Sequence, residues 1–476
     1  MNVPTSTLTA LPTDILSRVL TFSFSFDALL SSILTCKVIY EVYKAHPNSV
    51  KRNVAENVTG SRSVLKEALR AIRYGASDED SETEDDEDDP KTDQVGMDKS
   101  GITLTNKEIT QLVEIAMKYR ALEDVFSLRH KNRRFKSTQL TPSESLRFQR
   151  ALYRIDLYSR MFSGVSYAEE FETQNPEDEE VQERVEKDRK ERERFLSAFS
   201  TAELREIWTV SQFLTDIFVW AEGDDADTPD NASTTHKLDM ALSVGPASIY
   251  RCWDEGTVDM LTAELEYWFA DGAFDHPLVA GYLRDPLAKL FRERNAKAPF
   301  DDSEHWSSVD EARGVDDKCS RCDKRPGFDL WGPSTYEYLH QTTPSLRPGT
   351  GLVKLLQGEL SRNSTECRYF HFLIGKRPKG ESVYEHVVQD LLDCDYKTPE
   401  FDDWKKDDWL CTGCLEKFLR ENLHLWLQSG KDGLILILTA GEEIPIDCWY
   451  GWDCRTQKHA DHAKKRNVRI DAWVYE

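Results

Sequence analysis

The feature that most constrains this fold is a pair of C-x-x-C motifs, one at Cys319 and Cys322 and the other at Cys411 and Cys414. Two residues between the thiolates allow both sulfurs to reach one tetrahedral Zn²⁺ from a tight turn, which leaves two coordination positions for a second pair. The two motifs together predict a closed, structural zinc site with no open position for catalysis. About ninety residues separate the motifs, more than in simple zinc ribbons, so two unrelated cysteine pairs are the alternative.

The residues around these motifs predict a separate, zinc-supported α+β region over residues 301–440. The second motif opens an amphipathic helix, whose N-terminus favours thiolate charge. Two short apolar runs, residues 369–374 and 434–438, are predicted to be strands. No βαβ pattern surrounds either motif, which argues against a thioredoxin-like redox role. One face of the predicted helix carries Phe418, Leu419, Leu423 and Trp426.

The composition predicts a folded intracellular protein. Hydrophobic residues make up 39% of the 476 positions and aromatic residues 11%, which is too rich for a disordered chain. No apolar run approaches the roughly 20 residues that span a bilayer, and the N-terminus lacks the basic and apolar segments of a secretion signal. We therefore expect a soluble protein of the cytoplasm or nucleus, with no membrane partner and with its ten cysteines in a reducing compartment.

The formal net charge of −24 argues against a generic nucleic-acid binder, because such proteins normally present a basic surface. Much of this negative charge lies in one short segment. Residues 76–96 contain an almost continuous acidic run that repels itself and buries nothing, and they are predicted to form a disordered linker. Helical signals dominate residues 105–220 and 237–300, and residues 223–236 between them are predicted to be a second linker.

Two helix starts carry capping signals. Thr141 and Glu144 form a capping box, with Pro142 at the first helical position, and apolar residues follow at helical spacing. Ser200 and Glu203 repeat the pattern ahead of another apolar series. The highly charged stretch between these two starts is predicted to be a solvated helix.

Residues 8–50 form the most informative segment of the chain. Pro12 can open a helix with one apolar face, and Asp27 can cap a second helix. Short apolar helices of this kind cannot form a core alone, so they need one another or a partner's groove. The order of apolar residues and a Cys-Lys pair resembles the F-box, and the N-terminal location and length match as well. The residues that carry the resemblance are Leu11, Pro12, Asp14, Ile15, Leu16, Val19, Leu20, Leu29, Leu30, Leu34, Cys36 and Lys37.

The resemblance implies a three-helix motif that docks on the Skp-family linker subunit of a cullin–RING (SCF-type) ubiquitin ligase. The tryptophan that usually follows the Cys-Lys pair is replaced here by Ile39 or Tyr40. A plain N-terminal helical hairpin is the alternative, and the resemblance says nothing about the protein substrate. The family's docking or core positions fall on Leu11, Pro12, Ile15, Leu16, Leu34 and Cys36.

Residues 441–476 contain a further group of metal-ligand residue types. Cys448 and Cys454, followed by His459 and His462, offer two thiolates and two imidazoles within reach of one zinc ion. The segment is therefore predicted to be a small zinc finger.

The spacing of these two cysteines, with Tyr450 before a glycine, resembles the poly(ADP-ribose)-binding zinc finger family. It also resembles the C-terminal finger of a group of fungal F-box proteins. The first resemblance implies that Tyr450 stacks on adenine and that basic residues, here Arg455, contact phosphates; single-stranded RNA has the same chemistry. The finger is degenerate, because His462 lies one place late and the last ligand position falls on Asn467 or Val468. The alternative is a scaffold whose aromatic residues pack on the domain.

These observations predict a mainly α protein with F-box helices, a helical middle region and a C-terminal α+β region supported by zinc. No Gly-rich phosphate loop, nucleophile elbow or HExxH motif is present, so an enzyme is not expected. The primary hypothesis is a substrate-recruiting F-box adaptor with an unknown protein substrate. The alternative is a zinc-finger protein that binds ADP-ribose polymer or nucleic acid.

Overall fold

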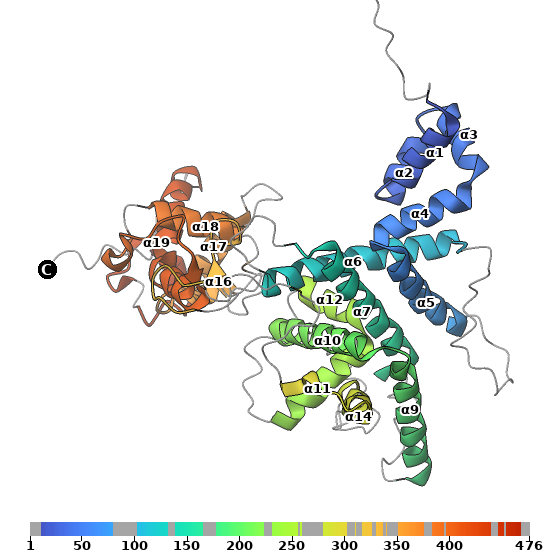
Figure 1. The fold of residues 1–476 in the computed structure, drawn as a ribbon. Coiled ribbons are helices and arrows are strands. Elements are labelled where there is room, and N and C mark those ends of the chain that lie inside the picture. The colour runs from blue at the N-terminus through green and yellow to red at the C-terminus, as the bar shows by residue number, and fades with distance from the viewer. Residues whose placement is uncertain are drawn as a thin grey trace, which may run out of the picture. The chain divides into compact units, whose positions relative to one another are not determined.

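The computed structural model divides the chain into two compact units (Figure 1). The N-terminal unit comprises Met1–Asp124, Leu140–Val219 and Thr228–Asp310, and the C-terminal unit comprises Val125–Gln139, Trp220–Asp227 and Glu311–Glu476. The residues that the structure describes are 11–79, 102–131, 139–164, 178–222, 231–255, 258, 279–301, 310, 317–325, 330–336, 339, 351–375, 383–394, 397–438, 446–451 and 454–467.

Four short helices begin the N-terminal unit, and we refer to them as the N-terminal module. They are α1 (Thr13–Thr21), α2 (Phe26–Ile33), α3 (Lys37–Ala45) and α4 (Pro47–Thr59). Pro12 directly precedes α1, as predicted. The prediction that Asp27 caps α2 was wrong: the Ser25 hydroxyl accepts a hydrogen bond from the Ala28 N–H at 3.1 Å, and Asp27 lies in the first helical turn. Ser25 takes the cap because it lies in extended backbone with its hydroxyl free to reach the helix N–H groups.

The core of the N-terminal module is apolar and involves every one of its helices. It includes Ile39, one of the two residues at the position where the F-box usually has tryptophan. Helix α6 (Asn106–His130) contributes Ala116 to the same core. The other buried members are Leu16, Leu20, Leu29, Val42, Val50, Val54 and Val58.

The other described elements of the N-terminal unit are helices. The two predicted capping signals are confirmed. Thr141 Oγ1 accepts from the Glu144 N–H at 3.3 Å and Glu144 Oε2 accepts from the Thr141 N–H at 2.7 Å. Ser200 and Glu203 make the same reciprocal pair of bonds. The elements are α5 (Arg62–Glu79), α7 (Pro142–Met161), α9 (Glu179–Ser197), α10 (Thr201–Glu222), α11 (Asn231–Val244), α12 (Pro246–Glu255), α14 (Arg284–Glu293) and the 3₁₀ turn η4 (Pro299–Asp301).

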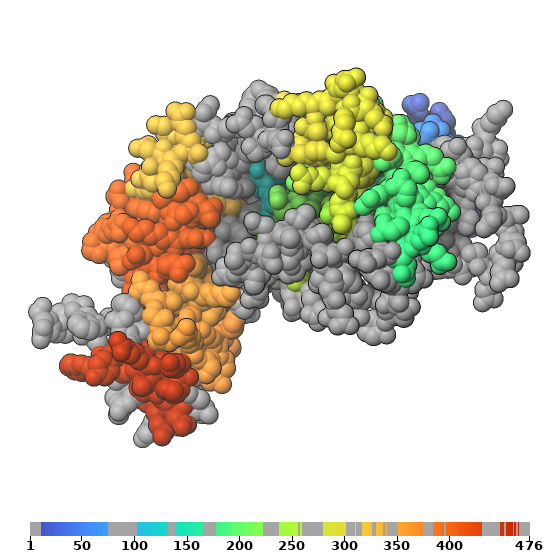
Figure 2. All heavy atoms as spheres, turned by 90° about the horizontal axis from the view of Figure 1, so that it is seen from below, coloured from blue at the N-terminus to red at the C-terminus, as the bar shows by residue number. Residues whose placement is uncertain are grey.

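Helix α9 is the charged helix predicted to be solvated, but it has a buried face. Val181, Val185 and Leu196 are buried along it. Helix α14 packs beside α9 (Figure 2, yellow beside green). Lys289 of α14 lies 2.5 Å from the Glu193 carboxylate of α9. A highly charged sequence can therefore contain a few apolar residues at helical spacing that form one narrow buried face.

Both predicted linkers are shorter than expected. Helix α5 continues to Glu79, into the segment predicted as linker 76–96, and α11 begins at Asn231, inside the predicted linker 223–236. A helix that is already nucleated by packing gains one hydrogen bond for each further residue, so it extends past its buried part. The remaining residues of both segments lie outside the described part of the chain.

The C-terminal unit is built around the long helix α19 (Thr412–Leu438). Trp331, Phe370, Leu391, Phe418 and Leu423 are among the residues of its apolar core. Strands β1 and β2 pair antiparallel, with Leu330 opposite Cys411, and β3 and β4 pair parallel. The other elements are β1 (Leu330–Trp331), α16 (Gly351–Lys354), η7 (Leu360–Arg362), α17 (Ser364–Gly375), α18 (Val383–Asp393), η8 (Pro399–Phe401), β2 (Leu410–Cys411), β3 (Ile446–Asp447), α20 (Ala460–Lys465) and β4 (Arg466–Asn467).

The mainly α prediction is confirmed, but the two predicted strands were wrong. Residues 369–374 lie in α17 and residues 434–438 end α19. Periodicity cannot separate a short strand from a buried helical segment when an apolar run spans only five or six residues, and here both runs belong to longer helices. The described strands are only two residues long. No described helix combines the length and the apolar character needed to cross a membrane.

Candidate metal centres and an exposed apolar face

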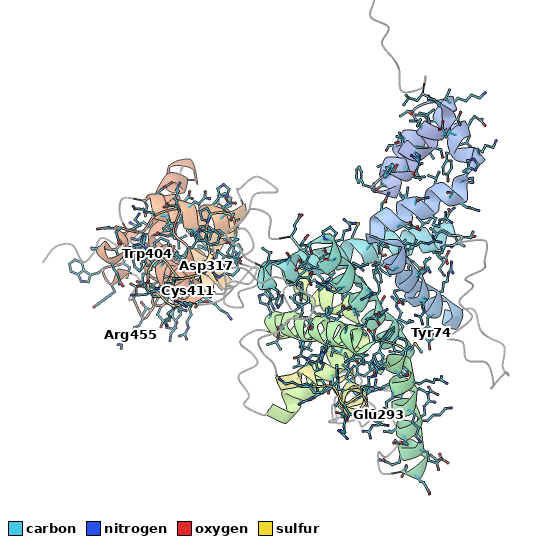
Figure 3. All side chains as sticks on the ribbon, in the orientation of Figure 1. Tyr74, Glu293, Asp317, Trp404, Cys411 and Arg455 are labelled. Atoms are coloured by element: carbon cyan, nitrogen blue, oxygen red, sulfur yellow. The ribbon has the colours of Figure 1, made fainter. Side chains whose placement is uncertain are left out.

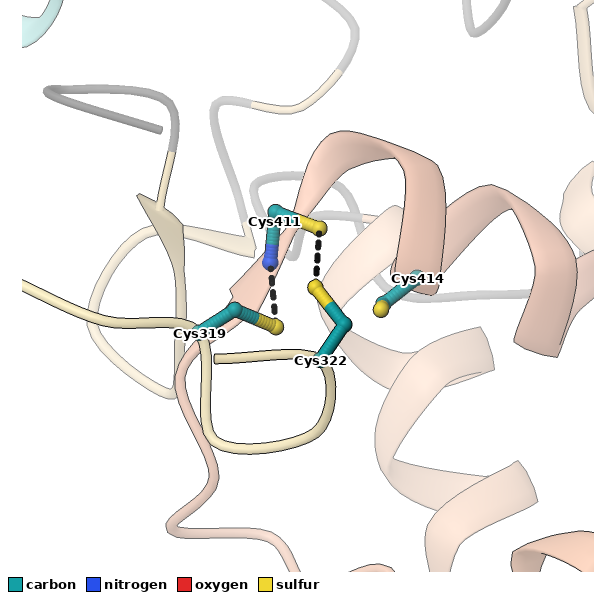
Figure 4. A group of neighbouring side chains, drawn as sticks. All are labelled: Cys319, Cys322, Cys411 and Cys414. Carbon is teal, nitrogen blue, oxygen red and sulfur yellow. Dashed lines mark hydrogen bonds between the residues drawn. The ribbon is translucent and has the colours of Figure 1, made fainter. Parts of the chain in front are cut away.

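Four cysteine thiols come together in the C-terminal unit, and we call them the tetrathiolate group. The sulfur atoms of Cys319, Cys322, Cys411 and Cys414 all lie within 4.8 Å of one another. Figure 4 shows the four side chains converging. The sulfurs of Cys322 and Cys411, 89 positions apart in sequence, are 3.6 Å apart. The structure therefore unites both C-x-x-C motifs, and the group could hold a metal ion.

Local structure presents each of these thiols. The Cys319 N–H donates to the Lys324 carbonyl at 2.9 Å and so closes the first cysteine turn. Asp323 within this turn has a φ of 55°, in the left-handed region that aspartate tolerates better than most residues. Cys411 ends β2, and Cys414 lies in the first turn of α19. The predicted position of the second motif at a helix start is confirmed.

The thiols of this group differ in their tendency to ionise. Burial opposes ionisation of Cys319, but hydrogen bonds from backbone N–H groups, the largest from Cys411, outweigh it and lower its pKa to about 7. Burial raises the pKa of Cys411 and of Cys414; the neighbouring thiols add to the rise at Cys414, whereas at Cys411 hydrogen bonds from Cys414 oppose it. Thiolates this close to one another repel, and a coordinated metal deprotonates thiols directly, so a bound cation would favour the ionised form of the group. Four thiolates also fill a tetrahedral site, so nothing is left open for a substrate.

A second ligand group lies near the C-terminus and comprises Cys448, Cys454 and His462. Their ligand atoms lie within 4.8 Å of one another, and Cys454 Sγ is 3.4 Å from His462 Nε2. The predicted fourth ligand, His459, is exposed and lies outside this group. His462 is carried by α20, whereas His459 lies in the turn before that helix begins. Among the described residues the group has three ligands rather than the predicted four.

This C-terminal segment is fastened to α17. Gly451 has a φ of 49°, and its carbonyl accepts a hydrogen bond from the side chain of Gln457 at 2.6 Å. The Asn363 side chain donates in turn to the Gln457 oxygen at 3.4 Å. Asn363 also accepts from the Glu366 N–H at the start of α17. Gln457 and Asn363 are both fully buried, so the segment belongs to the body of the C-terminal unit.

The turn between Cys448 and Gly451 exposes two aromatic side chains. Trp449 is 83% exposed and Tyr450 is 65% exposed, so neither packs on the domain as a scaffold role would require. Arg455, the other predicted ligand contact, is exposed as well (Figure 3). Trp452, the third aromatic residue expected to pack on the domain in a scaffold, lies outside the described residues.

A third feature, in the N-terminal module, is a set of exposed apolar side chains. On and beside α1 they recur at Leu11, Ile15, Val19 and Phe22, which is the spacing of one helical stripe. Phe22 is 78% exposed and Phe24 is 80% exposed. We call the whole set the apolar face; it consists of Leu11, Ile15, Val19, Phe22, Phe24, Leu30, Leu34, Val38 and Tyr40.

The residues predicted for docking divide between this face and the core. Leu11, Ile15 and Leu34 belong to the apolar face, and Pro12 is exposed beside them. Leu16 is buried in the core of the module. Cys36 is half-buried and packs against the same core. The prediction did not include Phe22 and Phe24 among the docking residues, although Phe22 continues the spacing of the α1 stripe.

Comparison with protein-family models, with curated proteins and with solved structures gave no match. Three features of the structure therefore bear on function: the tetrathiolate group, the second ligand group and the apolar face. Two of them could hold metal ions, and the third is a surface.

Proposed function

We propose that this chain is a non-catalytic, substrate-recruiting F-box adaptor of a cullin–RING ubiquitin ligase. The observation that carries the proposal is the apolar face, which is displayed by the helices whose sequence resembles the F-box. Its nine exposed apolar side chains all lie within residues 11–40, and large exposed apolar patches on soluble monomers typically mark binding surfaces. Covering such a surface contributes about 25 cal/mol for each Å² of apolar area removed from water.

The geometry of the module suits docking without rearrangement. The Asn57 side chain, from α4, donates to the carbonyls of Thr21 and Ser23, each at 2.9 Å. These bonds fix the turn between α1 and α2, which carries Phe22 and Phe24. A surface that is already ordered loses less conformational entropy on binding, which favours affinity.

The module is also joined to the helices that follow it in the same unit. Arg120 of α6 donates to the carbonyls of Asn57 and Val58, the latter at 3.1 Å. An adaptor needs such a connection, because the docked end and the part that holds a substrate must move as one body. In the proposal, the remaining helices of the chain recruit the protein substrate.

We propose further that both cysteine-containing groups hold structural zinc. Thiolate and imidazole are the ligands that zinc favours, and a site built from four thiolates is typical of structural zinc. The three-ligand group fits the same ion through two thiolates and the imidazole of His462. Zinc in this role stabilises the C-terminal unit and performs no reaction.

A second candidate function belongs to the C-terminal segment. Trp449 and Tyr450 offer exposed rings, and Arg455 is an exposed cation five residues after Tyr450 in sequence, which suits ADP-ribose polymer or single-stranded RNA. The overall negative charge opposes binding of polyanions at low ionic strength. A filter assay on the full chain tests the function, because the Asn363–Gln457 contact makes this segment part of a larger unit. Tyr450→Ala should lower retention with zinc content unchanged; equal retention by wild type and variant would remove this candidate.

Affinity capture tests the adaptor proposal. Wild-type chain should capture a Skp-type subunit, identified by mass spectrometry, whereas Pro12→Asp/Ile15→Asp should not, because two charges then lie within the docking surface. Met117→Asp is the matched control, since Met117 is 69% exposed on α6, outside the apolar face. If the wild type captures no Skp-type subunit, the adaptor proposal fails.

A further inference from the structure

Arg321 lies between the two cysteines of the first motif, yet its side chain contacts the chain just before the second motif. Its Nε donates to Asp408 Oδ2 at 2.9 Å, and its Nη1 donates to Asp403 Oδ2 at 2.8 Å. Its Nη2 donates to the Asp403 carbonyl at 2.7 Å and also contacts the Asp408 carboxylate. The guanidinium lies 5.2 Å from the centre of the Trp404 ring. One side chain therefore bridges positions 82 and 87 residues away in sequence.

Backbone contacts run parallel to this bridge. The Ser320 N–H donates to the Trp409 carbonyl at 2.8 Å, and the Trp409 N–H donates to Ser320 Oγ at 3.0 Å. The Trp409 ring packs so closely on Gly332 that a Cβ there would meet it at 2.6 Å. The turn that contains Cys319 and Cys322 is thus hydrogen-bonded to the residue just before β2.

The contacted segment is in turn fixed on α19, the helix that carries Cys414. Trp404 stacks on Phe418 of α19, with ring centroids 5.3 Å apart and an angle of 17° between the rings. Phe401 meets Phe418 edge-on at 5.3 Å and is fully buried. Figure 3 labels Trp404 and Cys411 in this unit. A continuous path of contacts therefore leads from Arg321 to both cysteines of the second motif.

We infer that Arg321 is a positioning residue for the tetrathiolate group, which holds the two motifs together whether or not a metal is bound. We call its contacts with Asp403, Trp404 and Asp408 the arginine clasp. Bringing the ends of so long a segment together costs loop-closure entropy, which the clasp offsets before any metal binds, together with the Ser320–Trp409 hydrogen bonds and the β1–β2 pairing. Since the clasp already joins the ends, a bound metal meets four thiols in place. With the clasp closed, a thiolate that dissociates from the metal stays close enough to bind it again, which slows metal loss.

The burial of the clasp distinguishes it from an ordinary surface ion pair. The side chains of Arg321 and Asp408 are each 15% exposed, whereas that of Asp403 is 78% exposed. A planar guanidinium can serve two carboxylates and an aromatic face together, which a lysine ammonium cannot do with the same geometry. Arg321→Lys is therefore expected to preserve only part of the clasp, although it preserves the charge.

The inference rests on the metal-binding part of the proposed function and not on the adaptor part. It is tested by the rate at which zinc passes from the full chain to an excess of chelator. The Cys411→Ser variant identifies which phase of zinc release belongs to the tetrathiolate group, because this variant should lack that phase. Arg321→Gln should accelerate the phase by about tenfold to a hundredfold, which matches the loss of metal affinity that follows removal of a residue supporting the ligands. Arg321→Lys should fall between this variant and the wild type.

Three comparisons separate positioning from general stabilisation. Arg362→Gln is the matched control in the same unit, since Arg362 is mostly exposed and lies 3.4 Å from Glu359, and it should release zinc at the wild-type rate. Arg321→Gln/Asp408→Asn should be no faster than Arg321→Gln, because both changes open the same clasp. Near-ultraviolet circular dichroism should show that the unit stays folded during release. If Arg321→Gln fails to fold, Asp403→Asn provides the test through a smaller acceleration.

Release from Arg321→Gln at the wild-type rate would overturn the inference, and so would full recovery by Arg321→Lys. An equal acceleration in Arg362→Gln would also overturn it. Wild-type protein that contains no zinc would overturn the metal proposal and the inference together. Zinc-loaded wild type with an unchanged Arg321→Gln rate overturns the inference alone.

Discussion

The N-terminal module and the C-terminal unit each present groups suited to a further binding partner, but the groups differ in kind. The module directs nine large apolar side chains to solvent around a core that is complete without them. The C-terminal unit brings thiols and an imidazole together at two points. A surface of the first kind is satisfied by another protein, and a cluster of the second kind is satisfied by a cation.

The comparison predicts opposite consequences of mutation. Residues of the apolar face contribute to binding and little to folding, since their side chains are exposed before any partner arrives. Residues of the tetrathiolate group contribute to folding, since a bound metal stabilises only the folded state. Each experiment below perturbs one side of this contrast, beginning with the largest expected effect.

Cys411→Ser should destabilise the C-terminal unit most. The variant should lose one zinc ion by elemental analysis, and calorimetry should show a lower unfolding temperature for that unit alone. The loss of stability can reach about 10 kcal/mol, the scale measured for small zinc peptides, and is less to the extent that the unit's own core persists. Equal zinc content and equal unfolding temperature in variant and wild type would refute the metal side of the contrast.

Substitution of two neighbouring residues on α1 should have very different effects on the free energy of unfolding. Leu16→Ala should cost about 2–5 kcal/mol, because Leu16 is only 3% exposed in the module core. Ile15→Ala should change stability by less than about 0.5 kcal/mol, because Ile15 is 39% exposed. Urea unfolding measures both values. Similar losses for the two variants would mean that the apolar face belongs to the folded core.

Acid should destabilise the C-terminal unit through His424. Burial lowers the pKa of this histidine to about 4, whereas an unfolded histidine titrates near about 6.5. The unfolded state therefore takes up the proton more readily, and stability falls as the pH drops from about 6.5 to about 4, by at most about 3 kcal/mol. Urea unfolding in chelator at several pH values should show this slope in wild type and a smaller one in His424→Gln. Identical slopes would contradict this assignment.

Sequence reasoning succeeded where the signal was local. The capping box at Thr141 and Glu144 involves residues three apart, and it forms as predicted. The spacing of each C-x-x-C motif likewise indicated that its own two thiols lie together, but it left open whether the two motifs meet, which the structure shows they do. It failed for residues 369–374, because a short apolar run fits a strand and a buried helix equally well.

Other features depend on contacts that no local pattern specifies. The arginine clasp joins residues 82 and 87 positions apart, and no spacing rule connects Arg321 with Asp403 or Asp408. The fourth predicted ligand, His459, is a suitable residue type close in sequence to the other three, but it lies in a turn away from them. The exposed pair Phe22 and Phe24 was missed because apolar residues in a connecting turn are usually expected to be buried.

The central claim is that the apolar face of the N-terminal module docks on a Skp-type subunit. Calorimetric titration of the purified chain with a purified Skp-type subunit tests it most directly. Wild type and Met117→Asp should bind with equal affinity and with the negative heat-capacity change that accompanies burial of apolar surface. Ile15→Asp/Leu34→Asp should remain folded and show no binding. Absence of binding by the wild type, or unchanged binding by Ile15→Asp/Leu34→Asp, would contradict the account.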